Sequence, residues 1–366
     1  MKIGVLGPIS WRVPPRHYGG WELVTHNLVE GLVKRGHDVT LFATADSETR
    51  ARLVSVCPRP LSEDSTLPAR AYETLHTALA LEHAGEFDLI HNHMGSYSVC
   101  YSRVIPVPMV TTLHGSAAED QSRLIYSRYR DSHYVSITNA ERILAPELNY
   151  VDTVYNGIDV ELFEFSPTHG DYLLVLGRVS PDKGIHTAIS VAERCGMRLI
   201  IAGIVPPENE EYFETQVKPH LKRGLIDFVG PADHALKNRL LKGAYAFLHL
   251  ITYHEAFGLT MVESMACGTP VVAVPMGSVP EIVTNGENGF WADDVEEVCR
   301  VLPGVAKLDR THCRKWVEDR FGVDQMVDSY VRVYEKVLRL SPIPSPGSSV
   351  TASPPSLPME SKPVSP

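Results

Sequence analysis

The amino-acid sequence predicts an α/β protein built from two doubly wound domains that face one another across a cleft. Short apolar runs alternate with helical stretches along the chain, which is typical of parallel sheets covered by helices on both faces. The second half repeats this alternation, and 366 residues suit two domains of ordinary size. We therefore place the domains at residues 1–163 and 164–320.

The first domain opens with an apolar strand, KIGVLG, at residues 2–7. An amphipathic helix is expected at 22–36, because Leu28 and Leu32 recur on one side of it and Gly36 supplies a stop signal. Further strands are expected at 37–44, 87–93, 108–115 and 133–138. Such buried runs between helical segments indicate a parallel sheet.

The second domain shows the same pattern and ends in a long helix. Its strands are expected at 171–178, 198–203, 226–230, 245–251 and 270–274, with helices at 185–196 and 235–244 among them. The last helix is expected at about 311–340. Residues 341–366 contain eight Pro and eight Ser and cannot bury enough apolar surface to fold, so we expect this tail to be disordered.

The composition and net charge limit which classes of partner and which cellular compartment we expect. A net charge of −10 argues against nucleic acid, which requires a basic surface. The six cysteines include no C-x-x-C pair, so neither a disulfide framework nor a zinc site is expected. The first residues do not form a signal peptide, and no apolar run reaches the roughly 18 residues of a membrane span. We expect a cytoplasmic protein.

Ligands of such domains bind beyond the carboxyl ends of the strands, so the informative motifs are those that follow strands. HYGGWE, residues 17–22, follows the first strand and opens its helix. Gly19 and Gly20 lack side chains, so their backbone N–H groups could approach a phosphate at the helix N-terminus. A plain Gly-Gly turn is the alternative. The dinucleotide fingerprint G-x-G-x-x-G is absent, which disfavours a dehydrogenase.

The motif GRVSPDKG, residues 177–184, follows a strand of the second domain. Arg178 offers a planar fork to a phosphate, and Lys183 adds a point charge close by. Two solvated surface cations are the alternative. The position between a strand and a helix favours phosphate binding.

The strongest motif is EAFGLTMVE, residues 255–263. Glu255 precedes a helix whose N-terminus, opened by Gly258, offers backbone N–H groups to sugar hydroxyls or phosphate. Glu263 lies in an apolar run, where an unpaired carboxylate would cost several kcal/mol. A vicinal diol such as a ribose would supply two donors to it. The alternative is a helix-surface glutamate paired with a distant lysine or arginine.

Other polar residues carry weaker signals. His114 ends a strand and could reach the same cleft. The histidines of HNH, residues 91–93, are interpreted as packing or cleft lining rather than as a metal pair. The chain has no D-x-D motif, so no divalent metal is expected. Residues 120–134 interleave arginines with tyrosines, which favours a solvated face but leaves contact with anionic lipid open.

Taken together, the Gly-Gly motif, GRVSPDKG and the two glutamates separated by seven residues resemble glycosyltransferase family 4, whose members have the two-domain GT-B fold. The resemblance covers about residues 1–340. It implies that residues 321–340 form a helix that crosses back onto the first domain. Where many members have G-G-x-x-E, this chain has MGSVPE, and Gly277 and Glu281 remain.

The family implies a retaining, metal-independent transferase that uses a nucleotide-diphospho sugar and no other cofactor. It assigns the diphosphate to Arg178 and Lys183, the ribose hydroxyls to Glu263 and the donor sugar to Glu255. Further donor contacts are implied for Gly19, Gly20, His114, Phe257, Gly258 and Leu259. A uracil base is favoured, with guanine next, in the region after DFVG (227–230).

The expected reaction is transfer of a hexose from a UDP-sugar, or next from GDP-mannose, to an acceptor bound by the first domain. A polysaccharide, a glycolipid and a small metabolite all remain open as acceptors, as does transient contact with a membrane. The alternatives are a nucleotide-sugar epimerase of the same fold and a nucleotide-sugar binding protein without catalysis.

Overall fold

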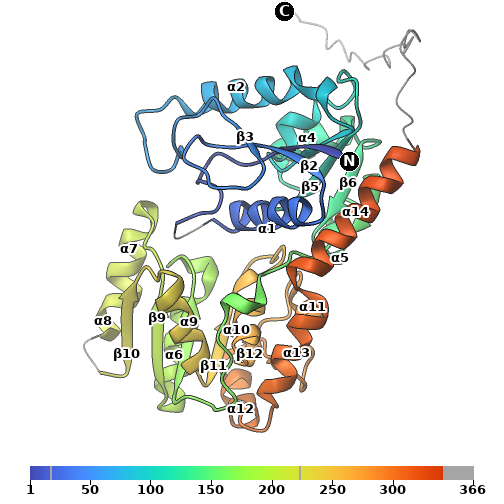
Figure 1. Cartoon of the computed structure of the whole chain (residues 1–366). Coiled ribbons are helices and arrows are strands. Elements are labelled where there is room, and N and C mark those ends of the chain that lie inside the picture. The colour runs from blue at the N-terminus through green and yellow to red at the C-terminus, as the bar shows by residue number, and fades with distance from the viewer. Residues whose placement is uncertain (17–18, 222–223, 341–366) are drawn as a thin grey trace, which may run out of the picture.

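A computed structural model describes residues 1–16, 19–221 and 224–340 of the chain. They form two α/β domains, each built around one parallel sheet (Figure 1). The tail at 341–366, expected to be disordered, lies outside the described residues, as do residues 17–18 of the Gly-Gly motif. No helix within the described ranges is both long and apolar enough to cross a membrane.

The sheet of the first domain has seven parallel strands in the order β3-β2-β1-β4-β5-β6-β7. The strands are β1 (Lys2–Leu6), β2 (Asp38–Phe42), β3 (Arg52–Val54), β4 (Leu89–Asn92), β5 (Met109–Leu113), β6 (His133–Ser136) and β7 (Tyr150–Thr153). The helices are α1 (Gly20–Lys34), α2 (Ala69–Glu82), α3 (Ser96–Val99), α4 (Asp120–Arg128) and α5 (Asn139–Leu144), with short 3-10 turns η1 (Ala84–Glu86) and η2 (Val160–Leu162). Ile3 of the interior strand β1 pairs with Val39 on one side and Leu89 on the other.

The sheet of the second domain has six parallel strands in the order β10-β9-β8-β11-β12-β13. The strands are β8 (Tyr172–Leu176), β9 (Arg198–Ala202), β10 (Ile226–Gly230), β11 (Ala246–His249), β12 (Val271–Ala273) and β13 (Gly289–Trp291). The α-helices are α6 (Ile185–Cys195), α7 (Glu210–Tyr212), α8 (Lys218–Leu221), α9 (His234–Gly243), α10 (Leu259–Ala266), α11 (Val279–Ile282), α12 (Val295–Val305), α13 (Arg310–Arg320) and α14 (Val323–Leu340). The remaining turns are η3 (Pro181–Lys183), η4 (Pro207–Asn209) and the π-helical η5 (Phe213–Val217).

Three strands and several helices go beyond the prediction from sequence. The missed strands are β3, β7 and β13, and each lies at the edge of its sheet. They are only three or four residues long and only partly buried, so they carry no continuous apolar run. The helices without a predicted counterpart are α2, α3, α4, α5, α7, α8, α11 and α12. The longest of them is α2, of which only three residues are buried. The pattern of apolar residues marks a central element more clearly than a half-solvated one.

The helix expected as one piece over about 311–340 is in fact two helices, α13 and α14. The chain breaks between them because its backbone pairs there with the segment that joins the domains. The Ile158 N–H donates to the Phe321 carbonyl at 2.9 Å, and the Val323 N–H donates to the Ile158 carbonyl at 3.1 Å. Backbone groups used in this way cannot continue the helical hydrogen-bond ladder.

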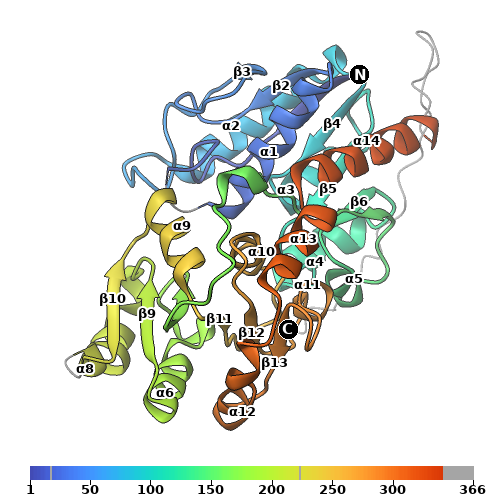
Figure 2. The same ribbon diagram turned by 60° about the horizontal axis from the view of Figure 1, so that its bottom comes forward.

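The helix α14 lies along the first domain although it follows the second in sequence (Figures 1 and 2). Its apolar face enters the same buried cluster as Leu28 and Leu32 of α1. The buried residues of this face are Met326, Val327, Tyr330, Val333, Tyr334 and Val337. The helices approach closely at Gly31, where an added Cβ would lie 2.5 Å from the Cγ2 of Val327. A glycine in α1 therefore permits this contact.

We predict that Gly31→Ala weakens the docking of α14. The new methyl group would overlap Val327, which is fully buried and stiff at its branched Cβ. Overpacking costs about 1–3 kcal/mol, and better helix propensity returns at most about 1 kcal/mol. We expect a net loss in the free energy of unfolding, measured by urea denaturation followed by circular dichroism.

Two controls separate this contact from a general effect of alanine. A Cβ at Gly85 would meet nothing within 4 Å, so Gly85→Ala should change the unfolding free energy by less than about 0.5 kcal/mol. The double variant Gly31→Ala/Val327→Ala should lose less than the sum of the two single losses, because the overlap is gone. Strict additivity would contradict the predicted overlap.

Candidate active site

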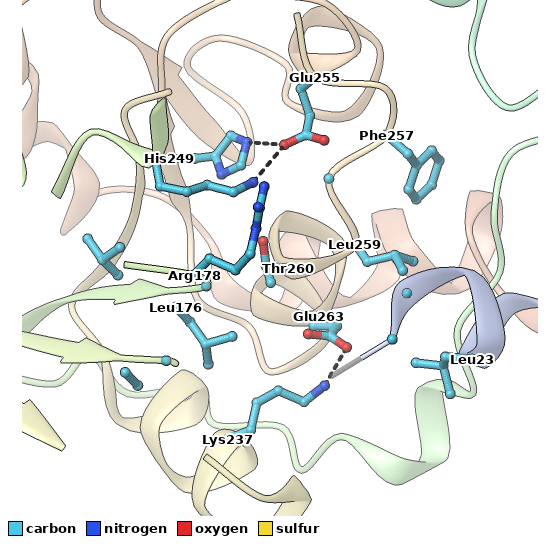
Figure 3. A pocket seen from close by; sticks show the side chains of 18 of the residues that line it. Leu23, Leu176, Arg178, Lys237, His249, Glu255, Phe257, Leu259, Thr260 and Glu263 are labelled. Carbon is cyan, nitrogen blue, oxygen red and sulfur yellow. Dashed lines mark hydrogen bonds and ion pairs between the residues drawn. The ribbon is translucent and has the colours of Figure 1, made fainter. Parts of the chain in front are cut away.

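The residues singled out in the sequence come together at one cavity of about 290 Å³ (Figure 3). The first domain and the second domain both contribute to its lining. All ten candidates are present in the lining: Gly19, Gly20, His114, Arg178, Lys183, Glu255, Phe257, Gly258, Leu259 and Glu263. The segments that carry them follow β1, β5, β8 and β11, so the carboxyl edges of both sheets meet at this cavity.

Glu255 lies between β11 and α10 and is buried among polar partners. Its Oε2 accepts a hydrogen bond from the Tyr253 hydroxyl at 2.5 Å and lies 3.1 Å from His249 Nε2. The ammonium of Lys183 is 3.7 Å from the same oxygen. Burial by itself raises the pKa of Glu255, but His249, Lys183 and Tyr253 together lower it to about 2. The carboxylate is therefore ionised at neutral pH.

The two cations of GRVSPDKG have different surroundings. Lys183 ends η3, donates a hydrogen bond to the Tyr253 hydroxyl and sits 4.6 Å from the centroid of that ring. Arg178 is more exposed, and its nearest carboxylate is that of Asp182 at 3.9 Å. Gly184 has a φ of 65°, and a Cβ there would lie 1.8 Å from the Leu250 carbonyl oxygen. Only a glycine lets this loop lie against the neighbouring strand.

The start of α10 forms another wall of the cavity. Gly258 caps the helix with a φ of 85°, which favours glycine, and Leu259 is its first residue. The positive end of the helix dipole is therefore at the cavity. Phe257 touches the cavity but is 3% exposed, and its ring packs edge-on against Phe321. Its main contribution here is to packing.

Glu263 is buried at 3% exposure and has a counter-charge within the protein. The ammonium of Lys237, from α9, lies 2.5 Å from its Oε1 (Figure 3). The sequence leaves a distant lysine open as the partner of a helix-surface glutamate, but the observed pair lines the cavity. Nothing in the local pattern around Lys237 singles it out, because the helix that carries it is separate from the glutamate's helix.

The first domain closes the cavity with the start of α1 and with His114. Gly19 has a φ of 148°, and a Cβ on Gly20 would lie 3.3 Å from the Cδ1 of Leu259. The N-terminal ends of α1 and α10 thus face each other across the cleft. The His114 ring stacks on Trp21 with centroids 5.5 Å apart. Burial lowers the pKa of His114 to about 3, so its imidazole is neutral at pH 7.

The histidines of HNH are interior residues, in line with the interpretation of packing or cleft lining. His91 and His93 are fully buried, and each bonds to other side chains of the first domain or α14. In the described part of the chain, no group of three or more His, Cys, Asp or Glu side chains is arranged to hold a metal ion.

The arginines and tyrosines of residues 120–134 do not share one surface. Arg123, Arg128 and Arg130 are exposed, as a solvated face requires. Tyr126 is 5% exposed and packs inward, with its ring edge-on to Tyr134. Tyr129 is half-buried, and its ring lies 4.7 Å from the guanidinium of Arg103. The three arginines are therefore solvated, whereas Tyr126 belongs to the core.

A second, smaller cavity of about 110 Å³ adjoins the first and lies within the first domain. Trp21 and His114 line both cavities, so they form the boundary between them. The second cavity is also lined by Ser96, Thr112, Ser116, Glu119 and Ser122. Hydroxyl groups and one carboxylate dominate its polar lining, and the described residues around it include no lysine or arginine.

Glu281, the acidic residue of MGSVPE, fastens the two domains together. Its carboxylate accepts hydrogen bonds from the N–H groups of Asn139 at 2.9 Å and Ala140 at 2.7 Å. The Tyr155 hydroxyl donates to it at 2.8 Å. These bonds hold the N-terminus of α5 in the first domain against α11 in the second, because Glu281 lies within α11.

Solved structures share this architecture along nearly the whole chain. A sucrose-phosphate synthase from Thermosynechococcus elongatus matches 93% of this chain and 100% of its own, with a TM-score of 0.77 at 20% identity. HepE of Anabaena, solved in complex with UDP, matches 92% of this chain and 100% of its own, with a TM-score of 0.74 at 21% identity. At these identities the likeness shows the fold, which is GT-B.

Relatives by sequence point to a family. A glycogen synthase of Mycobacterium tuberculosis is 27% identical over 77% of this chain and 80% of its own length. A D-inositol 3-phosphate glycosyltransferase of Mycolicibacterium smegmatis is 25% identical over 89% of each chain. The family model "Glycosyltransferase Family 4" matches residues 18–162, and "Glycosyl transferases group 1" matches residues 163–300. The two models adjoin and cover both domains, and the chain belongs to glycosyltransferase family 4.

Proposed function

We propose that the protein transfers a hexose from a nucleotide-diphospho sugar to a hydroxyl group of an acceptor, with retention at the anomeric carbon and without a metal ion. One observation carries the proposal. Arg178, Lys183 and the N-terminus of α10 converge on a single cavity that also contains Glu263. This set of groups fits a diphosphate next to a ribose.

The donor that we favour is a UDP-sugar such as UDP-glucose, with GDP-mannose next. HepE of Anabaena, which shares the fold, has been solved with UDP and with UDP-glucose. GDP-mannose stays in second place because a phosphatidyl-myo-inositol mannosyltransferase of Mycolicibacterium smegmatis is also a relative, at 25% identity. In the proposed pose, the base lies beside Pro231 and Ala232, which line the cavity just after β10.

The proposed chemistry is stabilisation of the leaving group. Departure of a nucleoside diphosphate builds negative charge on its phosphates. Lys183 and the start of α10 are held in position before the reaction, so they need not reorganise as this charge develops. Arg178 is more exposed and adds a second positive charge at the same cavity. The same groups supply positive charge where a metal ion would otherwise be needed.

The two carboxylates of the cavity do not provide the pair of acid and nucleophile that a double-displacement glycosidase uses. The described lining contains two glutamates. Glu255 is kept ionised by its three partners and Glu263 is paired with Lys237, so neither is an available proton donor. This suits the substitution on one face of the sugar that the family resemblance implies, in which the leaving phosphate takes the proton of the acceptor hydroxyl.

We place the acceptor in the second cavity. It opens beside His114 and Trp21, which also border the donor cavity, so an acceptor there would lie next to the donor sugar. Its serine and threonine hydroxyls and Glu119 can bind a hydroxyl-rich molecule.

We predict that Lys183→Ala slows release of the nucleoside diphosphate about 10²–10³-fold, because one preorganised donor to the leaving group is lost. The measurement is the rate at which UDP or GDP is released from UDP-glucose, UDP-galactose, UDP-N-acetylglucosamine and GDP-mannose, with water or added sugars as acceptor. Addition of EDTA should leave the wild-type rate unchanged. Lys315→Ala is the control, because among the described residues this exposed lysine pairs with the neighbouring Asp319 of α13 alone.

Other outcomes discriminate among the candidate functions. A changed sugar without diphosphate release would indicate an epimerase. Donor binding without any turnover would indicate a binding protein. A rate that EDTA abolishes, or that Lys183→Ala leaves intact, would contradict the proposed stabilisation of the leaving group.

We also predict that Glu263→Ala weakens nucleotide binding about 10–100-fold, because hydrogen bonds to a buried carboxylate contribute about 1.5–3 kcal/mol each. The measurement is calorimetric titration of UDP, GDP and ADP into the wild type and the variant. A 2′-deoxy analogue of the preferred nucleotide should lose affinity for the wild type but not for the variant, since the partner carboxylate is then already absent.

Glu296→Ala is the control for this titration, because Glu296 lies on the exposed face of α12 beside Arg194. It should bind like the wild type. Equal binding by the wild type and Glu263→Ala would remove the ribose role from Glu263. Failure of all three nucleotides to bind the wild type would remove the transferase proposal itself.

A further inference from the structure

A chain of three histidines connects the cavity wall to the last helix. His114 Nε2 lies 2.7 Å from His93 Nδ1, and His93 Nε2 lies 3.2 Å from His91 Nδ1. The chain ends at Tyr334 of α14, whose hydroxyl is 2.7 Å from His91 Nδ1. Residues more than 200 positions apart in the sequence are thereby joined.

All four groups are neutral at pH 7. His91, His93 and Tyr334 are fully buried, and His114 is 8% exposed. Burial lowers the pKa of His91 and His114 to about 3 and that of His93 well below its usual value. Burial likewise raises the pKa of Tyr334 well above its usual value. Each imidazole therefore has one ring nitrogen that donates and one that accepts.

The Tyr334 hydroxyl determines which atom donates in each hydrogen bond that links the three histidines. Its proton needs an acceptor, and among the described residues its only hydrogen-bond partner is His91 Nδ1. A buried hydroxyl proton without an acceptor is costly, so Tyr334 donates and His91 Nδ1 carries the lone pair. The proton of His91 is then on Nε2, which lies 2.8 Å from the Thr112 hydroxyl and can donate to it.

The same argument assigns the protons of His93 and His114. Because His91 Nδ1 accepts, His93 must donate to it from Nε2 and must accept at Nδ1. His114 then donates from Nε2 to His93, which leaves a lone pair on His114 Nδ1. This nitrogen is buried and has no hydrogen-bond partner within the described residues. The reverse direction would leave the Tyr334 proton without an acceptor.

We infer that Tyr334 is a positioning residue that fixes the tautomer of His114, with the proton on Nε2 and the lone pair on Nδ1. This deepens the proposed function, because His114 borders the donor cavity, and it rests on that function for the part that His114 plays in binding. The tautomer itself is a property of the protein alone.

The test is nuclear magnetic resonance of protein labelled with ¹⁵N-histidine, which identifies the protonated nitrogen of each ring. The His114→Gln spectrum assigns the His114 signals. In the wild type at pH 7.5 we expect His114 protonated on Nε2 over Nδ1 by about tenfold or more, the factor that one unsatisfied buried group imposes. In Tyr334→Phe this preference should fall about tenfold, because the Phe ring has no proton to donate.

Tyr330→Phe is the matched control. Tyr330 is equally buried on α14, but its hydroxyl reaches His91 only through Thr112, which it contacts at 2.9 Å, so the Tyr330→Phe variant keeps the proton that Tyr334 donates to His91 Nδ1. It should leave His114 protonated on Nε2. Loss of packing would affect both tyrosine variants, whereas loss of the Tyr334 proton affects only one.

Two results would overturn the inference. One is a wild-type His114 protonated on Nδ1, which is decisive even if Tyr334→Phe does not fold. The other is a folded Tyr334→Phe variant whose tautomer ratio equals that of the wild type. Neither NMR measurement requires turnover. A failed transferase assay would therefore contradict the proposed function without changing the measured tautomer of His114.

Discussion

Two buried carboxylates need counter-charges, and this requirement arranges the cavity. Glu255 and Glu263 stand before and within α10, where an unpaired carboxylate would cost several kcal/mol. Each has a lysine from a different segment, Lys183 from the turn after β8 and Lys237 from α9. The turn and the helix must therefore stay where their lysines reach α10. Pairing of charge thus joins three segments around one space.

The same pairing bears on how a diphosphate would bind. Lys183 is shared between Tyr253 and Glu255 before any ligand arrives, so a phosphate would compete with these partners for one ammonium. Within the described ranges, the ion pair of Arg178 is its 3.9 Å contact with Asp182, and its side chain is more exposed than that of Lys183. It can turn toward a ligand at little cost, because a weak, solvated ion pair contributes little stability. In the proposed reaction, the side chain of Arg178 moves toward the diphosphate, whereas the ammonium of Lys183 is already in position.

The helix α14 packs on the first domain and also contacts residues behind the cavity wall. It leaves the second domain at Gly322, whose carbonyl oxygen would lie 2.6 Å from a Cβ on Gly157, and it crosses α1 at Gly31. Two close approaches of backbone thus bring it onto the first domain. From there Tyr334 reaches the histidine chain behind His114. The element that joins the domains is also the one that orders a wall of the cavity.

The sequence by itself determined the alternation of strands and helices and the interior strands of both sheets. It also determined every candidate residue that lies in a contiguous motif. Such features are local, because periodicity and turn chemistry act over a few residues. Only the tertiary structure decided the pairing of Glu263 with Lys237, the break before α14 and the link from His91 to Tyr334. These depend on which side chains meet across separate elements, and the pattern within one element carries no information about that.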